Sequence, residues 1–174
     1  MKRALLIGAI VLASGCSVDN TSTTQNDSTV RQTDEATGLV LEPSQKMYVT
    51  FSEMTSIYQD TMACVGLYAG GPTVQFVDFP TFMNYPAEST GTGGWGVYDP
   101  TGSWTKFWGG GELVTHVVLI NNHDTIVGTD RDNRTDTEVL IHEFIHHILN
   151  VNGVDWKHSN PLFGQCGVGV NTYN

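Results

Sequence analysis

Segment 138–149 constrains the fold of this chain most strongly, because it is apolar around most of a helical circumference. Its large apolar residues are Val139, Leu140, Ile141, Phe144, Ile145, Ile148 and Leu149. Thr135-Asp136-Thr137-Glu138 matches a capping box, in which the Thr135 hydroxyl and the Glu138 carboxylate each accept a backbone N–H. Asn150 to Gly153 predicts the end of the helix. We therefore predict a buried helix around which a domain must pack.

This helix carries three polar residues at a metal-binding spacing. His142 and His146 lie four residues apart, so both imidazoles share one face and can bind one ion. Glu143 is displaced by one residue and can address a metal-bound water. The pattern H-E-x-x-H resembles that of the zincin-type zinc metallopeptidases. The resemblance implies a zinc cofactor on the two histidines, with Glu143 as the base that moves a proton from water to the leaving amine.

A catalytic zinc needs a third protein ligand, and the two standard zincin patterns do not supply it. The glutamate-ligand branch takes a Glu from a later helix, but no Glu follows Glu143 in this chain. The metzincin branch expects His six residues after the second His, where this chain has Asn152. That branch also expects a later methionine turn, yet the last methionine is Met83. The chain therefore departs from both branches.

The remaining downstream candidates are Asp155, His158 and Cys166. Gly153 can reverse the chain after the helix and return His158 to the metal. His158 followed by Pro161 resembles bacterial lipoproteins in which a later His before a Pro follows H-E-x-x-H. Neutral imidazole is also the commonest zinc ligand, so we predict His158 as the third ligand. Asp155 is the alternative, as a ligand or as a partner that orients a ligand histidine.

Other histidines and tyrosines could line the site. His147 lies about 100° round the helix from His146, so we expect it at the rim or hydrogen-bonded in the core. His116 and His123 are interpreted as structural. An oxyanion stabiliser could come from Tyr85, Tyr98 or Tyr173, and the sequence does not choose among them.

The rest of the chain predicts an α+β fold. A helix capped by Ser44 would carry a stripe of Met47, Phe51, Met54, Tyr58 and Met62 at helical spacing. Strands are predicted at 73–79 and 113–121, a hairpin at 95–98 and 103–108, and a loop at 80–94. The zincin resemblance implies a small mixed sheet packed on an N-terminal helix and a buried active-site helix, with an edge strand, here 113–121, that binds extended peptides.

The N-terminus predicts export. Lys2 and Arg3 precede the apolar stretch 4–13, which is too short to span a bilayer. The sequence up to Cys16 resembles the lipobox of bacterial lipoproteins, with Ala13 where that pattern prefers Leu. We therefore expect a signal peptide at 1–15, lipidation at Cys16, a flexible tether at 16–38 and the peptidase domain at 39–174. An ordinary secretory signal is the alternative.

Net charge limits the classes of partner that we expect, and the cysteine content predicts a disulfide. Loss of Lys2 and Arg3 with the signal would change the formal net charge from −10 to −12, which argues against nucleic acid and anionic lipid as partners. A membrane contact would then come from the lipid at Cys16, in the outer membrane if the host has one, which Ser17 would suit. Cys64 and Cys166 most simply form a disulfide in an oxidising envelope, with Cys166 as a metal ligand the weaker alternative.

The sequence thus predicts an extracytoplasmic zinc peptidase acting on peptide or protein substrates. One alternative is a metal-binding or structural lipoprotein without catalysis. The other is a metal-independent domain in which His142 and His146 are merely buried polar residues.

Overall fold

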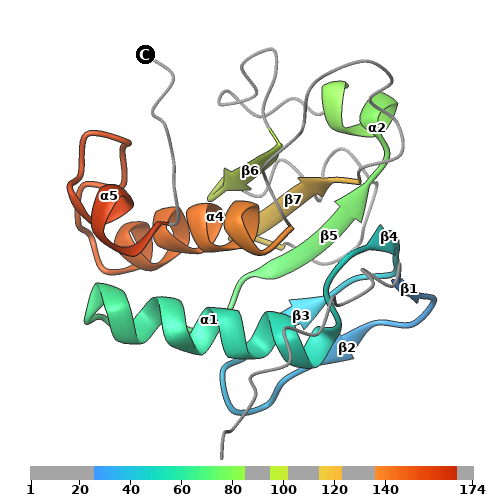
Figure 1. Ribbon diagram of the computed structural model, residues 1–174, viewed down its shortest axis with the longest axis horizontal. Helices are drawn as coiled ribbons and strands as arrows, with labels where there is room; N and C mark the ends of the chain where they lie inside the picture. The colour runs from blue at the N-terminus through green and yellow to red at the C-terminus, as the bar shows by residue number, and fades with distance from the viewer. Residues whose placement is uncertain (1–25, 85–94, 102–113, 123–135, 168–174) are drawn as a thin grey trace, which may run out of the picture.

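The computed structural model describes residues 26–84, 95–101, 114–122 and 136–167. Over these ranges the chain has the predicted α+β fold, in which a mixed sheet packs against helices (Figure 1). The strands are β1 (Asn26–Ser28), β2 (Gln32–Thr33), β3 (Val40–Leu41), β4 (Ser44–Met47), β5 (Thr73–Val77), β6 (Gly96–Asp99) and β7 (Val117–Asn121). The helices are α1 (Phe51–Val65), α2 (Phe79–Met83), α4 (Asp136–Val151) and α5 (Leu162–Cys166). None of these helices is both long and apolar enough to cross a membrane.

The main sheet has five strands in the order β2-β3-β5-β7-β6. Strands β3, β5 and β7 run parallel, and the outer strands β2 and β6 run antiparallel to their neighbours. β5 and β7 pair from Thr73 opposite Val117 to Val77 opposite Asn121. The predicted strand 113–121 therefore lies inside the sheet as β7, and its expected role as an edge is wrong. Among the described strands, β6 is the outer one on this side.

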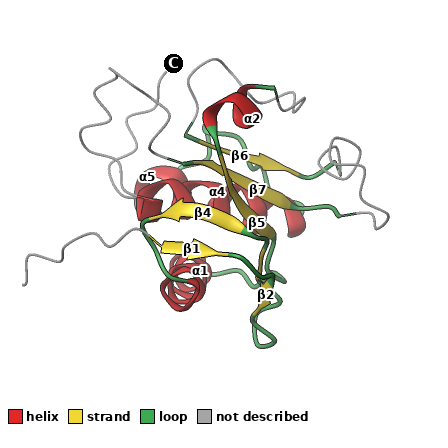
Figure 2. Cartoon of the chain, turned by 90° about the vertical axis from the view of Figure 1, so that its right-hand side faces the viewer, coloured by secondary structure: helices red, strands yellow, loops and turns green. Residues whose placement is uncertain are grey.

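The two faces of the sheet pack against different helices. Side chains alternate along a strand, so Val118 and Ile120 of β7 face a core shared with α1 and α4. The intervening residues Val117 and Leu119 pack with Phe82 of α2. Helices α1 and α2 accordingly lie at opposite ends of the molecule (Figures 1 and 2). Helix α4 is buried along most of its length, which confirms the predicted buried helix.

The cap of helix α1 lies six residues later than the predicted cap at Ser44. Thr50 caps it, accepting the Glu53 N–H at 3.2 Å while the Glu53 carboxylate accepts the Thr50 N–H at 2.6 Å. Ser44 instead opens β4, where its hydroxyl accepts the Phe76 N–H at 3.0 Å. The prediction of a Ser44 cap was wrong because that hydroxyl is engaged by β5, and Met47 reaches the core from a strand.

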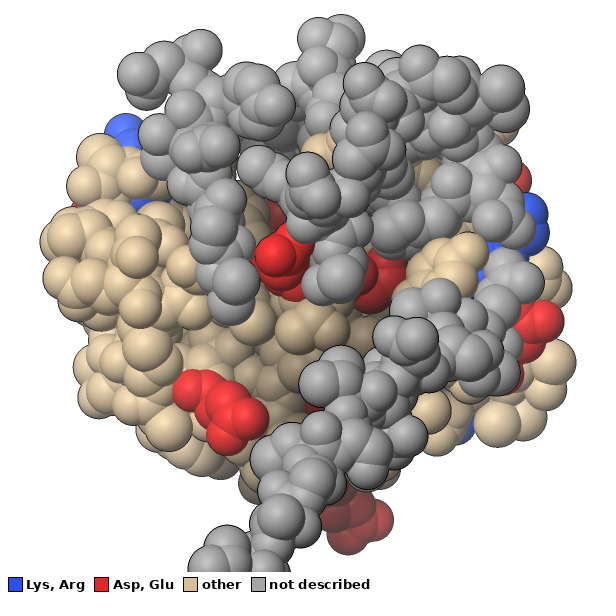
Figure 3. Space-filling view, in the orientation of Figure 1, with Lys and Arg blue, Asp and Glu red and all other residues tan. Residues whose placement is uncertain are grey.

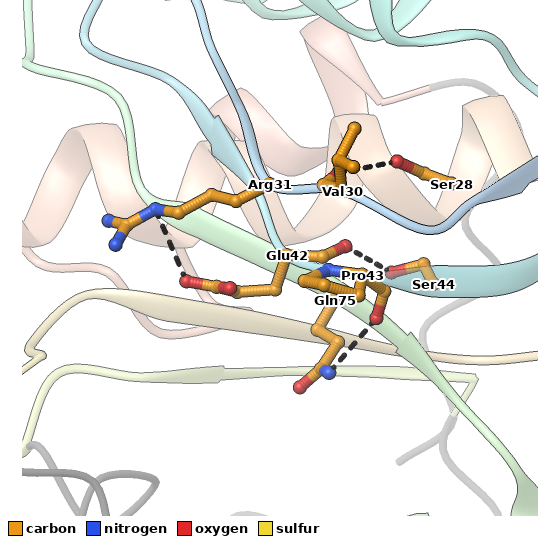
Figure 4. Close-up of polar contacts among 7 residues, drawn as sticks. All are labelled: Ser28, Val30, Arg31, Glu42, Pro43, Ser44 and Gln75. Atoms are coloured by element: carbon orange, nitrogen blue, oxygen red, sulfur yellow. Dashed lines mark hydrogen bonds and ion pairs between the residues drawn. The ribbon is translucent and has the colours of Figure 1, made fainter.

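Secondary structure is also present before the expected domain boundary at residue 39. Residues 26–38, expected to be part of the tether, form β1, which pairs with β4, and β2, which pairs with β3. Their polar side chains make hydrogen bonds and an ion pair at the sheet edge rather than apolar contacts, so composition alone misjudged them. Figure 4 shows this corner, where Ser28 donates to Val30 O, Ser44 donates to Glu42 O, Gln75 donates to Pro43 O, and Arg31 lies 3.4 Å from Glu42.

The segments on either side of residue 90 differ from the prediction or lie partly outside the described residues. The short helix α2 takes up the last residue of the predicted strand 73–79 and residues 80–83 of the predicted loop, because Asp78 caps it by accepting the Thr81 N–H at 2.9 Å and Pro80 fits the first turn. The second strand of the predicted hairpin, 103–108, lies outside the described residues, and β6 pairs with β7. Residues 1–25, which hold the signal and Cys16, and Thr135 of the capping box also lie outside the described ranges.

The predicted disulfide is present. Cys64, near the end of α1, is bonded to Cys166, the last residue of α5, with their Cα atoms 5.8 Å apart. The bridge joins residues 102 positions apart in the sequence. A structural disulfide of this kind favours an oxidising compartment outside the cytoplasm.

Candidate metal centre

Three imidazole nitrogens converge at one point beside α4. His142 and His146 lie one helical turn apart on α4, and His158 reaches them from the connection to α5. Their Nε2 atoms form a triangle with sides of 3.0, 3.0 and 3.2 Å. Ligands of a tetrahedral zinc ion at 2.0–2.1 Å lie about 3.3 Å apart, so the triangle is close to the spacing that such an ion needs. The three predicted ligand residues are thus brought together.

The protonation of His146 suits a ligand. Its Nδ1 lies 2.6 Å from the carbonyl oxygen of Trp156, which can only accept, so Nδ1 carries the hydrogen. Burial lowers the pKa of His146 to about 4, and the ring is therefore neutral at pH 7. Its Nε2 then presents a lone pair to the centre of the triangle. A carbonyl that orients a ligand histidine in this way is a common feature of metal sites.

The connection after α4 brings His158 back to the helix. Gly153 has a φ of 67°, a left-handed conformation that glycine adopts without strain, and the Val154 N–H donates to Leu149 O at 2.9 Å. The chain then turns around Asp155, whose carboxylate accepts the Lys157 N–H at 3.2 Å. Asp155, the alternative third ligand, is not part of the converging group and instead organises the turn that carries His158.

Phe163 of α5 lies against all three imidazoles. Its ring centroid is 4.5 Å from that of His146, 5.1 Å from that of His142 and 5.4 Å from that of His158. Phe163 is buried, whereas His158 is exposed and His142 is half-buried. The cluster therefore has an apolar side formed by Phe163 and a side open to solvent.

Glu143 points toward the sheet rather than toward bulk water. Only 5% of its surface is exposed, and its carboxylate accepts the backbone N–H of Tyr98 in β6. Gly96 of the same strand lies so close that a Cβ there would sit 2.9 Å from both Cγ and Oε1 of Glu143. Burial raises the pKa of Glu143 to about 8, and the Tyr98 N–H partly offsets this rise. In the metal-free protein the buried carboxyl is thus a proton-binding group near neutral pH.

The side of α4 that carries Glu143 and Asn150 is hydrogen-bonded to Tyr98 of β6. The Tyr98 hydroxyl lies 2.7 Å from Nδ1 of His116 and accepts a hydrogen bond from Asn150 Nδ2 at 2.8 Å. His147 is 1% exposed and donates from Nε2 to Gly70 O at 2.6 Å, which confirms the expectation that it is bonded in the core. Tyr98 is thus bonded to both Glu143 and Asn150 of α4, seven residues apart on one side of the helix.

The other predicted candidates either lie outside the described residues or are engaged away from the three imidazoles. The Tyr98 hydroxyl is committed to His116 and Asn150 in the interior, which does not suit an oxyanion donor. Tyr85, Tyr173 and His123 lie outside the described residues. Cys166 is in the disulfide and not a ligand.

The roles of Gly96, Trp156 and Phe163 were not anticipated from the sequence. Gly96 and Phe163 meet the site through the tertiary fold, so no local spacing reveals them. Trp156 acts through its backbone carbonyl, which any residue type would supply.

Comparison of the chain with protein-family models, with curated proteins and with solved structures found no match.

Proposed function

We propose that the protein is a zinc-dependent peptidase that acts outside the cytoplasm, with His142, His146 and His158 as zinc ligands and Glu143 as the general base. The observation that carries this proposal is the triangle of three Nε2 atoms at zinc-binding spacing, with Glu143 next to the first ligand. A bound zinc ion supplies the Lewis acidity that activates water and polarises a carbonyl group.

The proposed proton transfer is carried out by Glu143. Its carboxylate has to accept a proton from water and deliver it to the leaving amine. Positive charge held by the three histidines would favour the ionised, proton-accepting form of this carboxyl over the neutral form that burial favours. The H-E-x-x-H resemblance to the zincins supports this assignment, although the chain matches neither the glutamate-ligand nor the metzincin pattern.

The proposed substrates are peptides or proteins. β6 is the outer strand of the described sheet beside α4, and an extended peptide could add to such an edge by backbone hydrogen bonds. Nucleic acid is not a proposed partner, because the chain is acidic and the few Lys and Arg side chains described on the face in Figure 3 do not gather into a patch. We propose attachment to the cell envelope through lipid at Cys16, on the strength of the lipobox resemblance.

The decisive experiment separates catalysis from metal binding. Glu143→Ala should abolish hydrolysis of an unfolded protein substrate while one zinc per chain is retained. Glu138→Gln, on the same helix and outside the site, is the matched control and should hydrolyse the substrate as the wild type does. Hydrolysis that persists in Glu143→Ala would exclude Glu143 as the base.

A non-catalytic metal-binding protein is the second candidate, favoured by the burial of Glu143 behind Gly96. A base needs access to water, and a carboxylate with 5% of its surface exposed has little. Stoichiometric zinc with no hydrolysis of unfolded proteins by the wild type would select this function over the peptidase.

A further inference from the structure

The third histidine is the least firmly anchored part of the proposed metal centre. His142 and His146 are set by the backbone of α4, whereas His158 stands on the connection 152–161, in which most residues are exposed. Before His158 this connection is tied by the turn around the exposed Asp155 and by the carbonyl oxygen of the half-buried Trp156, which accepts a hydrogen bond from Nδ1 of His146. The hydrogen bonds around Asp155 are exposed and open easily, and none of these ties involves the His158 ring. An anchor after His158 is therefore needed to hold the ring against its two partners.

That second anchor is α5, which is fastened covalently to another part of the fold. Pro161 leads directly into α5, and Cys166 at its end is bonded to Cys64 in the last turn of α1. Helix α1 is in turn packed on α4 through the edge-on contact of Tyr58 with Phe144 at 4.9 Å. The path α4, connection, α5, disulfide, α1 and back to α4 is therefore closed, and it carries all three histidines.

Phe163 transmits this anchoring to the imidazoles. It is the second residue of α5, is 2% exposed, and has all three histidine ring centroids within 5.4 Å of its own. Ring contacts at such distances restrict the orientation of each imidazole. Groups that orient ligands in this way affect metal affinity without touching the metal.

We propose that Phe163, held in place by the Cys64–Cys166 disulfide, is a positioning residue for the metal centre, and that the disulfide sets zinc affinity through His158. The inference rests on the proposed zinc site but not on catalysis. It makes the affinity for zinc depend on a bridge whose Cys64 side is exposed at the surface.

Zinc affinity, measured by competition with a chromophoric chelator, tests this directly. Phe163→Ala and the double variant C64A/C166A should each bind zinc about tenfold or more weakly than the wild type, as is usual for groups behind the ligands. Phe163→Leu, which keeps part of the apolar surface, should fall between Phe163→Ala and the wild type. Alanine replaces both cysteines because free thiolates, like thiol reductants, would themselves bind zinc.

Phe82→Ala is the matched control. Phe82 is a phenylalanine as deeply buried, but it packs on the opposite face of the sheet with α2. Its zinc affinity should stay within about threefold of the wild type, although its stability falls as that of Phe163→Ala does. Circular dichroism identifies the variants that remain folded. If C64A/C166A does not fold, the Phe163 variants, which keep the disulfide, decide whether Phe163 positions the metal centre.

A cycle with His158→Ala shows whether the disulfide acts through that ligand. Removing the bridge should weaken zinc binding strongly when His158 is present and by less than threefold when it is absent. An equal loss of zinc affinity with and without His158 would overturn this inference but not the metal centre. Folded Phe163→Ala and C64A/C166A proteins with wild-type zinc affinity would do the same. A wild type that binds no zinc would instead refute the metal centre itself.

Discussion

Replacing Gly96 by alanine should displace Glu143 while the histidines stay in place. The backbone of Gly96 is not in the left-handed region, so the change introduces no backbone strain and acts through space alone. The new methyl group would sit 2.8 Å from Cγ1 of Val139 and 2.9 Å from Cγ and Oε1 of Glu143. Carbon atoms in contact prefer about 3.5–4.0 Å, so something must move by more than half an ångström.

The expected cost follows from these contacts. Overpacking of a core by one methyl group typically costs about 1–3 kcal/mol, and the lower entropy of an unfolded chain with Ala returns about 0.4–1 kcal/mol. We therefore expect a net loss of about 1–2 kcal/mol in the free energy of unfolding. The softer neighbour is the Glu143 side chain, since Val139 is β-branched and fixed in its rotamer. Glu143 should turn away, and hydrolysis should fall by about a hundredfold with a misplaced base.

Three measurements on Gly96→Ala check this reasoning. Urea denaturation gives the stability loss, chelator competition gives the zinc affinity, and hydrolysis of an unfolded protein gives the activity. In a Glu143→Ala background the same change should cost less stability, because Cγ and Oε1 of Glu143 are gone. A Gly96→Ala protein with wild-type stability and activity would refute the close packing of β6 on Glu143. A loss of zinc affinity as large as the loss of activity would refute the claim that only the base moves.

Three further predictions concern stability. In the presence of a chelator, Glu143→Gln should gain stability over the wild type as the pH rises from 5 to 8. Burial raises the pKa of Glu143 from 4.5 to about 8. The contribution of the protonated Glu143 to wild-type stability is therefore complete below pH 4.5 and is lost as the pH approaches 8. The gain should reach a few kcal/mol, on the order of 1.4 kcal/mol per pKa unit, and a difference independent of pH in thermal or urea melts would contradict it. Thr50→Ala removes the capping box of α1 and should cost about 1 kcal/mol in urea denaturation, with no loss if the cap is unimportant. C64A/C166A should cost about 4 kcal/mol, because the bridge closes a loop across 102 positions, and a loss below about 1 kcal/mol would mean that the bridge hardly restricts the unfolded chain.

Local patterns predicted α4 and the residues it presents. The apolar circumference, with His142 and His146 one turn apart, depends only on helical geometry, so the burial of the helix and the convergence of these two side chains follow from the sequence. The disulfide was predictable because Cys64 and Cys166 are the two cysteines left besides Cys16. The convergence of His158 with the α4 pair agrees with the choice made by elimination and resemblance, although its role as a ligand stays a prediction.

Features that depend on distant contacts were missed. Ser44 has the chemistry of a helix cap, yet its hydroxyl is hydrogen-bonded to β5. Helix α1 is instead capped by the Thr50–Glu53 pair. Residues 26–38 are nearly free of large apolar side chains, but two short strands there pair with β4 and β3 through their backbones. Gly96 and Glu143 are in contact although they lie 47 positions apart. Phe163 contacts histidines that lie 5 to 21 positions before it. No sequence periodicity encodes contacts at these separations.

The central claim is that three histidines bind one metal ion, and X-ray absorption at the zinc edge tests it most directly. The purified protein, loaded with one equivalent of zinc, should show three imidazole nitrogens at about 2.0–2.1 Å, and His158→Ala should show two. A wild-type spectrum with two imidazole ligands, or one unchanged by His158→Ala, would contradict the account.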